Sequence, residues 1–144
     1  MNPEQIFSIC NTLAMLGWIT LIFLKFWTKR DLFVFRIIIM LFAIVYSWLI
    51  ISSFDIEILK NFSTLNGVSI LFANKQMLLA GWIHYLAFDL LTGIYILHNA
   101  RKNGINHWVT APALFFTFLL GPFGWLLYFI IRLIKTKKYF PDNF

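Results

Sequence analysis

Apolar residues form four long runs that are separated by short polar stretches. The runs cover residues 6–26, 32–54, 77–97 and 108–134. Each run is long enough for a transmembrane helix, because about 20 apolar residues span a hydrocarbon core of roughly 30 Å. The pattern predicts an all-α membrane protein, in which four transmembrane helices form a small bundle and a single domain over residues 1–144.

The fourth run is interrupted by the sequence GPFG at residues 121–124. Glycine and proline are tolerated in membrane helices, so the simplest interpretation is one span that is kinked at Gly121–Pro122. The alternative is a re-entrant hairpin. Each half of it would have about 13 residues and a length of roughly 20 Å, too short to cross the membrane. We therefore expect the kinked span.

The loop between the second and third runs, residues 55–76, is too polar to span a bilayer. Within it, STLNGVSILF at residues 63–72 favours a short interfacial or re-entrant helix. The polar turn HNARKNGINH joins the third and fourth runs, and its Gly104 is suited to the end of a helix. No internal repeat divides the chain further.

Charge supports the membrane interpretation. Only 12% of the residues are charged, against about 25% in ordinary soluble domains. The net charge of +6 comes from basic residues that flank the apolar runs, so the expected partners are lipid headgroups and not nucleic acid. Four spans would place six basic residues on each side of the membrane, whereas a hairpin would place ten on one side and two on the other.

The single cysteine and the first ten residues bear on cellular location. Cys10 is the only cysteine, which excludes an intrachain disulfide. The sequence MNPEQIFSIC has no basic region of the kind that precedes a signal peptide core. We therefore expect the first apolar run to remain as a helix.

The third run contains the polar residues that raise a functional question, within GWIHYLAFDLLTG at residues 81–93. At about 100° per residue, Tyr85, Asp89, Thr92 and Gly93 share one helix face, and Gly81 lies at its edge. Small residues beside a polar group are typical of a helix–helix contact. Asp89 falls near the middle of the span, where a charge is most costly.

His84 is expected on a different face of this helix. It lies about 140° from Asp89, so the two side chains cannot form a hydrogen bond within the helix. It aligns instead with Phe88, Leu91, Tyr95 and His98. The two faces can border one cavity only if the other helices largely enclose the third.

Two interpretations of Asp89 remain open. In the first, Asp89 is a buried structural acid that accepts a hydrogen bond from a neighbouring helix. The candidate donors for that bond are Asn11, Trp18, Tyr46, Ser47 and Trp48. In the second, Asp89 acts as a general acid or base, or orients a ligand, since ionisable residues inside the membrane are commonly functional. The same choice between a structural and a functional role applies to His84.

Other kinds of site find little support in the sequence. Three histidines and one cysteine, with no close pair on a helix face, predict no metal site. No phosphate-binding loop or nucleophile elbow is present. The 17 Phe and 6 Trp residues are expected mostly to face the bilayer, and they are compatible with an aromatic pocket for a long polyene.

The order of several sequence blocks resembles the abscisic-acid-deficient-four-like family of membrane proteins, whose plant members are associated with neoxanthin synthesis. The blocks are IFSICNTLAMLGW, FSTLNGVSILF, GWIHYLAFDLLTG, ARKNGINH and FLLGPFGWLLYFIIR. The positions that match the family pattern are Asn11, Trp18, Trp82, His84, Asp89, Gly93, Gly121, Pro122 and Gly124. The chain departs from bacterial relatives at Ile94 and Tyr95, where they often have Arg-Trp, and at Asn99, where they often have an acid.

The resemblance implies a multi-pass protein of a bacterial inner membrane that acts on, or binds, a carotenoid or similar isoprenoid. The implied reaction is a cofactor-independent isomerisation, in which Asp89 protonates an epoxide oxygen and His84 removes a carbon-bound proton. The residues expected to line the substrate site are Asn11, Trp18, Tyr46, Trp48, Trp82, Tyr85, Gly93 and Tyr95.

Two alternatives to the enzyme are left open. One is a non-enzymatic carotenoid- or lipid-binding subunit or accessory protein, in which Asp89 and His84 tie helices together. The other is a proton-coupled carrier, for which one intramembrane acid is thin support. The sequence also leaves open whether the protein forms a homo-oligomer.

Overall fold

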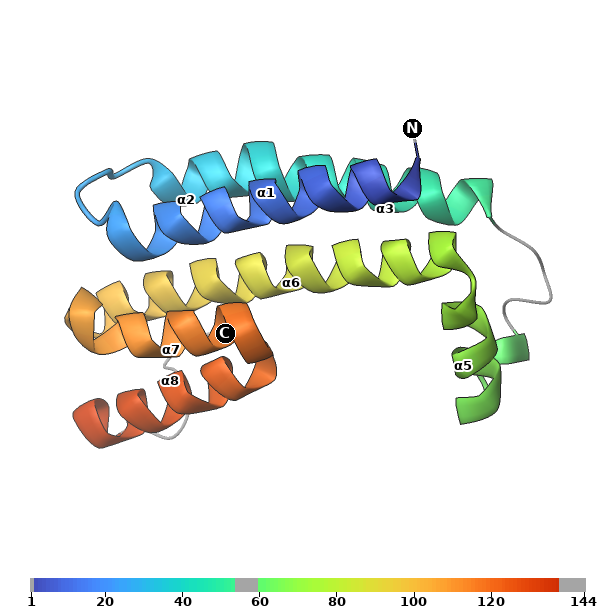
Figure 1. The fold of residues 1–144 in the computed structure, drawn as a ribbon. Coiled ribbons are helices and arrows are strands. Elements are labelled where there is room, and N and C mark those ends of the chain that lie inside the picture. The colour runs from blue at the N-terminus through green and yellow to red at the C-terminus, as the bar shows by residue number, and fades with distance from the viewer. Residues whose placement is uncertain (1, 54–59, 138–144) are drawn as a thin grey trace.

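The long helix α6 lies at the centre of the fold, and most of the other helices pack against it (Figure 1). The computed structural model describes residues 2–53 and 60–137. Every regular element within these ranges is helical. α6 (Lys75–Lys102) has 28 residues, which corresponds to about 42 Å. α1 (Pro3–Phe23) and α3 (Met40–Ser52) both pack along it.

Among the described residues, three helices are long and apolar enough to cross a membrane, namely Pro3–Phe23, Arg30–Ser52 and Lys75–Lys102. The second of these is a continuous series of α2 (Arg30–Phe33), the π-helical turn η1 (Val34–Ile39) and α3. The three helices confirm the first three predicted spans to within a few residues. The chain is an integral membrane protein.

Capping residues define where α1 and α6 begin. Asn2 precedes α1 and accepts a hydrogen bond from the Glu4 amide in a capping box. Asn74 precedes α6, and its side chain accepts from the amides of Gln76 and Met77. Asparagine is a favoured N-cap because its side-chain oxygen satisfies amides that have no partner within the helix. Asn74 therefore fixes the point at which the third span begins.

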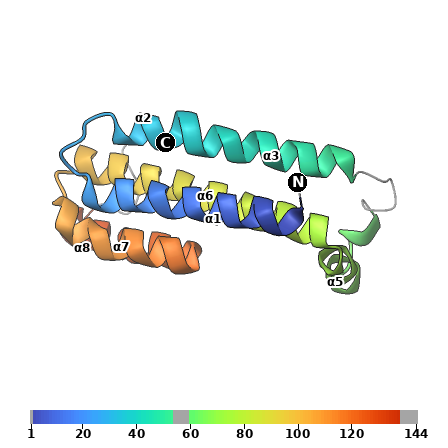
Figure 2. The same cartoon turned by 45° about the horizontal axis from the view of Figure 1, so that its top comes forward.

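The second loop contains α5 (Leu65–Ala73), at the position where the sequence predicts a short helix. The Thr64 hydroxyl caps it by accepting a hydrogen bond from the Gly67 amide at 3.0 Å. Figures 1 and 2 show that α5 lies crosswise to the three long helices, at one end of the bundle. Its Phe72 ring packs against Gly81 of α6.

The prediction of a fourth, kinked transmembrane helix is wrong. The fourth apolar run forms two helices, α7 (His107–Leu120) and α8 (Pro122–Thr136), which lie side by side with opposite directions (Figure 1). Gly121 separates them with a φ of +48°, a backbone conformation that glycine adopts without steric cost. This conformation of Gly121 lets the chain reverse its direction, so the fourth run forms a hairpin and not a kinked span. We refer to residues 107–136 as the α7–α8 hairpin.

A second glycine allows the two helices of the hairpin to pack closely. A Cβ atom on Gly124 would lie 2.0 Å from the Thr117 nitrogen and 2.5 Å from the Ala113 carbonyl oxygen. Only glycine fits such a contact between backbones. The sequence GPFG thus supplies both the turn, through Gly121, and the close approach of the two helices, through Gly124.

The α7–α8 hairpin covers only half of α6. α7 has 14 residues and therefore extends about 21 Å, against about 42 Å for α6. Figures 1 and 2 show the hairpin alongside the C-terminal half of α6, with its turn near the middle of that helix. The hairpin leaves the N-terminal half of the α1–α6 face uncovered.

The hairpin also gathers basic residues at one end of the bundle, where α1 and α6 end, α2 and α7 begin and α8 ends (Figure 1). We call this the basic end. Its described Lys and Arg residues are Lys25, Lys29, Arg30, Arg36, Arg101, Lys102, Arg132, Lys135 and Lys137. Asp31 forms an ion pair there with Arg101. The described basic residues of the opposite half are Lys60 and Lys75, so the positive-inside rule predicts a cytoplasmic basic end.

Candidate functional site

Asp89 lies in the middle of α6, directly against the turn of the hairpin. Its residue exposure is 7%. A Cβ atom on Gly121 would lie 2.7 Å from Asp89 Oδ1, so the turn and the carboxyl group are in contact. Asp89 Oδ2 is buried and has no hydrogen-bond partner among the described residues. A buried polar atom without a partner is unfavourable unless a ligand or water satisfies it.

An apolar groove extends from Asp89 between α6 and α8. One cavity of about 390 Å³ is lined by Phe88, Asp89, Thr92, Gly121, Pro122 and Trp125. A second cavity of about 360 Å³ is lined by Phe88, Leu91, Thr92, Tyr95 and Trp125. The two share Phe88, Thr92 and Trp125 and are therefore continuous. We call them together the Asp89 groove.

The first turn of α8 lies next to the Asp89 carboxyl group. Gly121 is the N-cap of α8, and Pro122 is the first residue of that helix. The N-terminus of a helix carries a partial positive charge, which stabilises a nearby negative charge. A carboxylate formed at Asp89 would therefore be stabilised by this helix end, in surroundings that otherwise disfavour charge.

A further cavity lies on the other side of the hairpin turn, between α1, α6 and α7. It has a volume of about 410 Å³ and is lined by Asn11, Ala14, Met15, Trp82, Tyr85, Leu86, Phe118 and Leu119. Trp82 Nε1 donates to Asn11 Oδ1 at 2.8 Å. The Tyr85 hydroxyl donates to the Leu119 carbonyl at 3.3 Å and lies close to Asp89. We call this the Tyr85 cavity.

His84 lies in different surroundings from Asp89. Its ring stacks on Phe88 with centroids 4.4 Å apart and lies 5.6 Å from the Tyr46 ring of α3. The side chain is exposed at the surface of the bundle. Phe88 also lines the Asp89 groove, so His84 lies behind the wall of that groove and does not line it.

The residues predicted to donate a hydrogen bond to Asp89 have other partners or positions. Asn11 accepts from Trp82, and Tyr46 contacts His84. The Trp18 ring is buried against Phe118 and Gly93, where a Cβ atom would lie 2.9 Å from the indole. Trp48 is 53% exposed on α3. The hairpin turn occupies the place that we expected one of these donors to fill.

Of the predicted substrate-site residues, the structure therefore places three in one cavity and one in another. Asn11, Trp82 and Tyr85 line the Tyr85 cavity, and Tyr95 lines the Asp89 groove. Sequence reasoning did not assign Phe88, Thr92 or Trp125 to a site. The sequence did contain an indication of the groove, since Phe88 and Thr92 are within four residues of Asp89 and Trp125 follows GPFG.

Comparison with known proteins gives one match. No curated protein and no solved structure matches the chain. A family model described as ABA DEFICIENT 4-like matches residues 5–128, a range that begins in α1 and extends into α8. It includes Asp89, the hairpin turn and the residues of both cavities. The chain belongs to the ABA DEFICIENT 4-like family, as its sequence blocks indicated.

Proposed function

We propose that the protein binds a carotenoid-like isoprenoid within the membrane and isomerises it, with Asp89 as the acid and base. The observation that carries the proposal is the unpartnered Oδ2 of a buried Asp89, which lines an otherwise apolar groove. Family membership is consistent with this assignment. We further propose a bacterial inner membrane as its location, because the sequence blocks resemble those of prokaryotic relatives.

The shape and lining of the cavities support a long, apolar ligand. The Asp89 groove and the Tyr85 cavity lie on either side of the hairpin turn and extend along α6 from Trp82 to Tyr95, a length of about 20 Å. Aromatic rings of Trp82, Tyr85 and Trp125 line this path. Flat rings offer large apolar contact areas to a conjugated chain.

The proposed reaction needs one proton donor and one proton acceptor. In hydrocarbon surroundings a charge is costly, so we assign the neutral carboxylic acid to resting Asp89. This acid protonates the epoxide oxygen of the substrate as a carbon–oxygen bond breaks. The resulting carboxylate then accepts a proton from a neighbouring carbon of the polyene, which leaves an allene and a hydroxyl group. Asp89 is restored, and no oxidant or reductant is consumed.

We assign both proton transfers to Asp89 because His84 lies behind Phe88. The first turn of α8 favours the transient carboxylate, while the apolar lining of the groove limits access of water to the reacting groups. His84 as the base, the expectation from sequence, would require movement of the Phe88 ring. A substitution of His84 separates the two assignments.

The second candidate function is non-enzymatic binding of the same ligand. The observation that favours it is the exposure of aromatic groove residues, since Phe88 is 56% exposed and Trp125 is 40% exposed. A site that opens to the bilayer in this way can hold a pigment without converting it. In this case Asp89 would anchor the hairpin turn or orient a hydroxyl group of the ligand.

The experiment compares lipid extracts of carotenoid-producing cells by chromatography and mass spectrometry. The cells carry the wild-type protein, Asp89→Asn, His84→Ala or no protein. We expect a new isoprenoid isomer with the wild type and with His84→Ala, and its loss with Asp89→Asn. An isomer that persists with Asp89→Asn refutes the enzymatic proposal. An unchanged profile together with pigment on the purified protein favours the binding function.

A tryptophan pair provides the control for the groove. Trp125 lines the Asp89 groove, whereas Trp108 lies on α7 away from it and is 52% exposed. We expect Trp125→Leu to lower the amount of isomer or bound pigment, and Trp108→Leu to leave it unchanged. Equal effects of the two substitutions would argue against the groove as the ligand site.

A further inference from the structure

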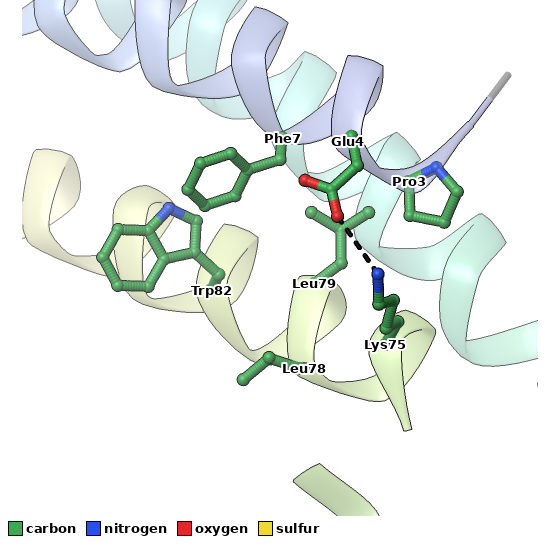
Figure 3. Close-up of a pocket in the computed structure, with 7 residues that line it drawn as sticks. All are labelled: Pro3, Glu4, Phe7, Lys75, Leu78, Leu79 and Trp82. Atoms are coloured by element: carbon green, nitrogen blue, oxygen red, sulfur yellow. Dashed lines mark hydrogen bonds and ion pairs between the residues drawn. The ribbon is translucent and has the colours of Figure 1, made fainter. Parts of the chain in front are cut away.

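A separate groove lies at the end of the bundle opposite the basic end, where α1 and α6 begin (Figure 3). It has a volume of about 400 Å³ and is lined by Pro3, Glu4, Phe7, Lys75, Leu78, Leu79 and Trp82. Its walls are apolar, and among the described residues that line it Glu4 and Lys75 are the charged ones. We call it the Glu4–Lys75 groove. It takes no part in the proposed proton chemistry.

The two charged residues lie at the mouth of this groove and form an ion pair. Lys75 Nζ and Glu4 Oε1 are 3.4 Å apart, and the two side chains are 79% and 68% exposed. Figure 3 shows the Glu4 carboxylate beside the side chains of Phe7 and Leu79, joined to Lys75 by the dashed line. An exposed ion pair contributes little to stability. Its two charges can therefore separate at small cost and bind a ligand that carries both complementary charges.

The groove continues towards the middle of the membrane. It shares Trp82 with the Tyr85 cavity, which ends at Phe118 and Leu119 in the last turn of α7. The α7–α8 hairpin does not cover the Glu4–Lys75 groove, because it extends along only the other half of α6 (Figure 1). From Lys75 to Trp82 the groove is about 10 Å long, which accommodates the first part of an acyl chain in a leaflet whose hydrocarbon layer is roughly 15 Å thick.

We propose that this groove is a binding site for a phospholipid whose headgroup carries both a primary ammonium and a phosphate. The ammonium contacts Glu4 and the phosphate contacts Lys75. One acyl chain lies along the groove between α1 and α6 and ends at Trp82, so that the Tyr85 cavity remains free for the isoprenoid. The lipid thereby fills part of the α1–α6 face that the hairpin leaves uncovered.

Charge and hydrogen bonding select this headgroup over others. A phosphatidylglycerol headgroup offers phosphate to Lys75 but no cation to Glu4. A phosphatidylcholine headgroup carries a cation without N–H donors, so it cannot form charge-assisted hydrogen bonds with a carboxylate. Phosphatidylethanolamine satisfies both residues. A fully apolar isoprenoid would leave the ion pair unchanged and gain nothing from it.

The test measures the lipids that remain on the full-length protein. The protein is reconstituted into bilayers of equal parts phosphatidylethanolamine and phosphatidylglycerol, extracted in mild detergent and analysed by mass spectrometry. One complementary charge near a membrane surface corresponds to about a fivefold preference. We expect retained phosphatidylethanolamine to exceed phosphatidylglycerol about fivefold, and Glu4→Gln to remove this preference. Retention in the bulk ratio, or a preference that survives Glu4→Gln, overturns the proposal.

Matched variants separate the headgroup contact from the acyl-chain contact. Lys60→Gln removes a basic residue in the same half of the molecule that does not line the groove, and it should leave the preference intact. Leu78→Trp fills the groove and should reduce total retained lipid, whereas Ile9→Trp, which alters an exposed α1 residue outside the groove, should not. Equal retention by Leu78→Trp and Ile9→Trp overturns the proposed chain position.

This lipid site and the isomerase proposal can fail independently. Asp89→Asn leaves the Glu4–Lys75 groove unchanged and should retain phosphatidylethanolamine like the wild type. If an isoprenoid is retained and phosphatidylethanolamine is not, the groove belongs to the isoprenoid and the lipid proposal is wrong.

Discussion

Replacement of Gly121 by alanine tests the contact between the hairpin turn and Asp89. Two effects add at this position. The φ of +48° is unfavourable for a residue with a Cβ atom and costs about 1–3 kcal/mol. The new Cβ atom would also lie 2.7 Å from Asp89 Oδ1, and overpacking of this kind costs about 1–3 kcal/mol. Together they predict a loss of about 2–6 kcal/mol in the free energy of unfolding.

Gly104 provides the matched control. It also has a positive φ, +63°, but a Cβ atom there would have no neighbour within 4 Å. Gly104→Ala should therefore show the backbone effect alone, about 1–2 kcal/mol. The free energies can be measured in mixed micelles by titration with a denaturing detergent, with circular dichroism as the readout. We expect Gly121→Ala to be the more destabilising of the two.

A double-mutant cycle assigns the difference to Asp89. Asp89→Ala removes the carboxyl oxygen that the new methyl group would meet. The Gly121→Ala/Asp89→Ala double variant should therefore lose about 1–3 kcal/mol less than the sum of the two single variants. Additive single effects, together with equal costs for Gly104→Ala and Gly121→Ala, would refute the contact between the turn and the carboxyl group.

Two further predictions concern the hairpin. Gly124→Ala forces a Cβ atom to within 2.0 Å of the Thr117 backbone and should separate α7 from α8. The expected results are a lower unfolding temperature and faster proteolysis. An unchanged unfolding temperature and proteolysis rate would contradict the close packing of the two helices. Burial and the nearby basic residues lower the pKa of His107, whose Nε2 lies 2.7 Å from the Ile22 carbonyl. Because its folded-state pKa lies below the usual value of about 6.5, its contribution to stability is full above that pH and is lost as the pH falls. His107→Gln keeps an N–H donor and should remove this loss of stability between pH 7 and about 5.5. An equal loss of stability in the variant would contradict the assignment of the pH effect to His107.

The sequence predicts the three long spans well because their formation depends on local composition. Hydropathy and capping residues such as Asn2 and Asn74 act within a few residues of the helix end that they define. The same reasoning applies to the short helix α5, which Thr64 caps. The helical repeat also correctly assigns Asp89 and His84 to different faces of α6.

The fourth apolar run could not be predicted in this way. A kink and a hairpin need the same residues at 121–124, and the choice between them depends on whether α8 finds a surface to pack on. Gly124 supplies that surface through its contact with Thr117, which lies seven residues earlier in the chain. Hydropathy does not contain such information, because both outcomes bury apolar residues in the bilayer.

The surroundings of Asp89 were missed for the same reason. A four-span bundle brings donors from α1 and α3 to the third helix, so Asn11 and Tyr46 were reasonable candidates. With the hairpin present, the turn at Gly121 reaches Asp89 instead, and Asn11 pairs with Trp82. The candidate site therefore depends on a tertiary feature that only the structure reveals.

The chain turns back at Gly121 within the membrane, and the turn thereby meets Asp89. The most direct test labels single cysteines with a membrane-impermeant thiol reagent in oriented vesicles, in a Cys10→Ser background. Asn103→Cys reports the turn before α7, Lys137→Cys the end of α8, and Asn66→Cys the opposite end of the bundle. We predict that Asn103→Cys and Lys137→Cys are labelled from one side of the membrane and Asn66→Cys from the other. Labelling of Lys137→Cys from the same side as Asn66→Cys would mean that the fourth run crosses the membrane, and would contradict both the hairpin and the site built on it.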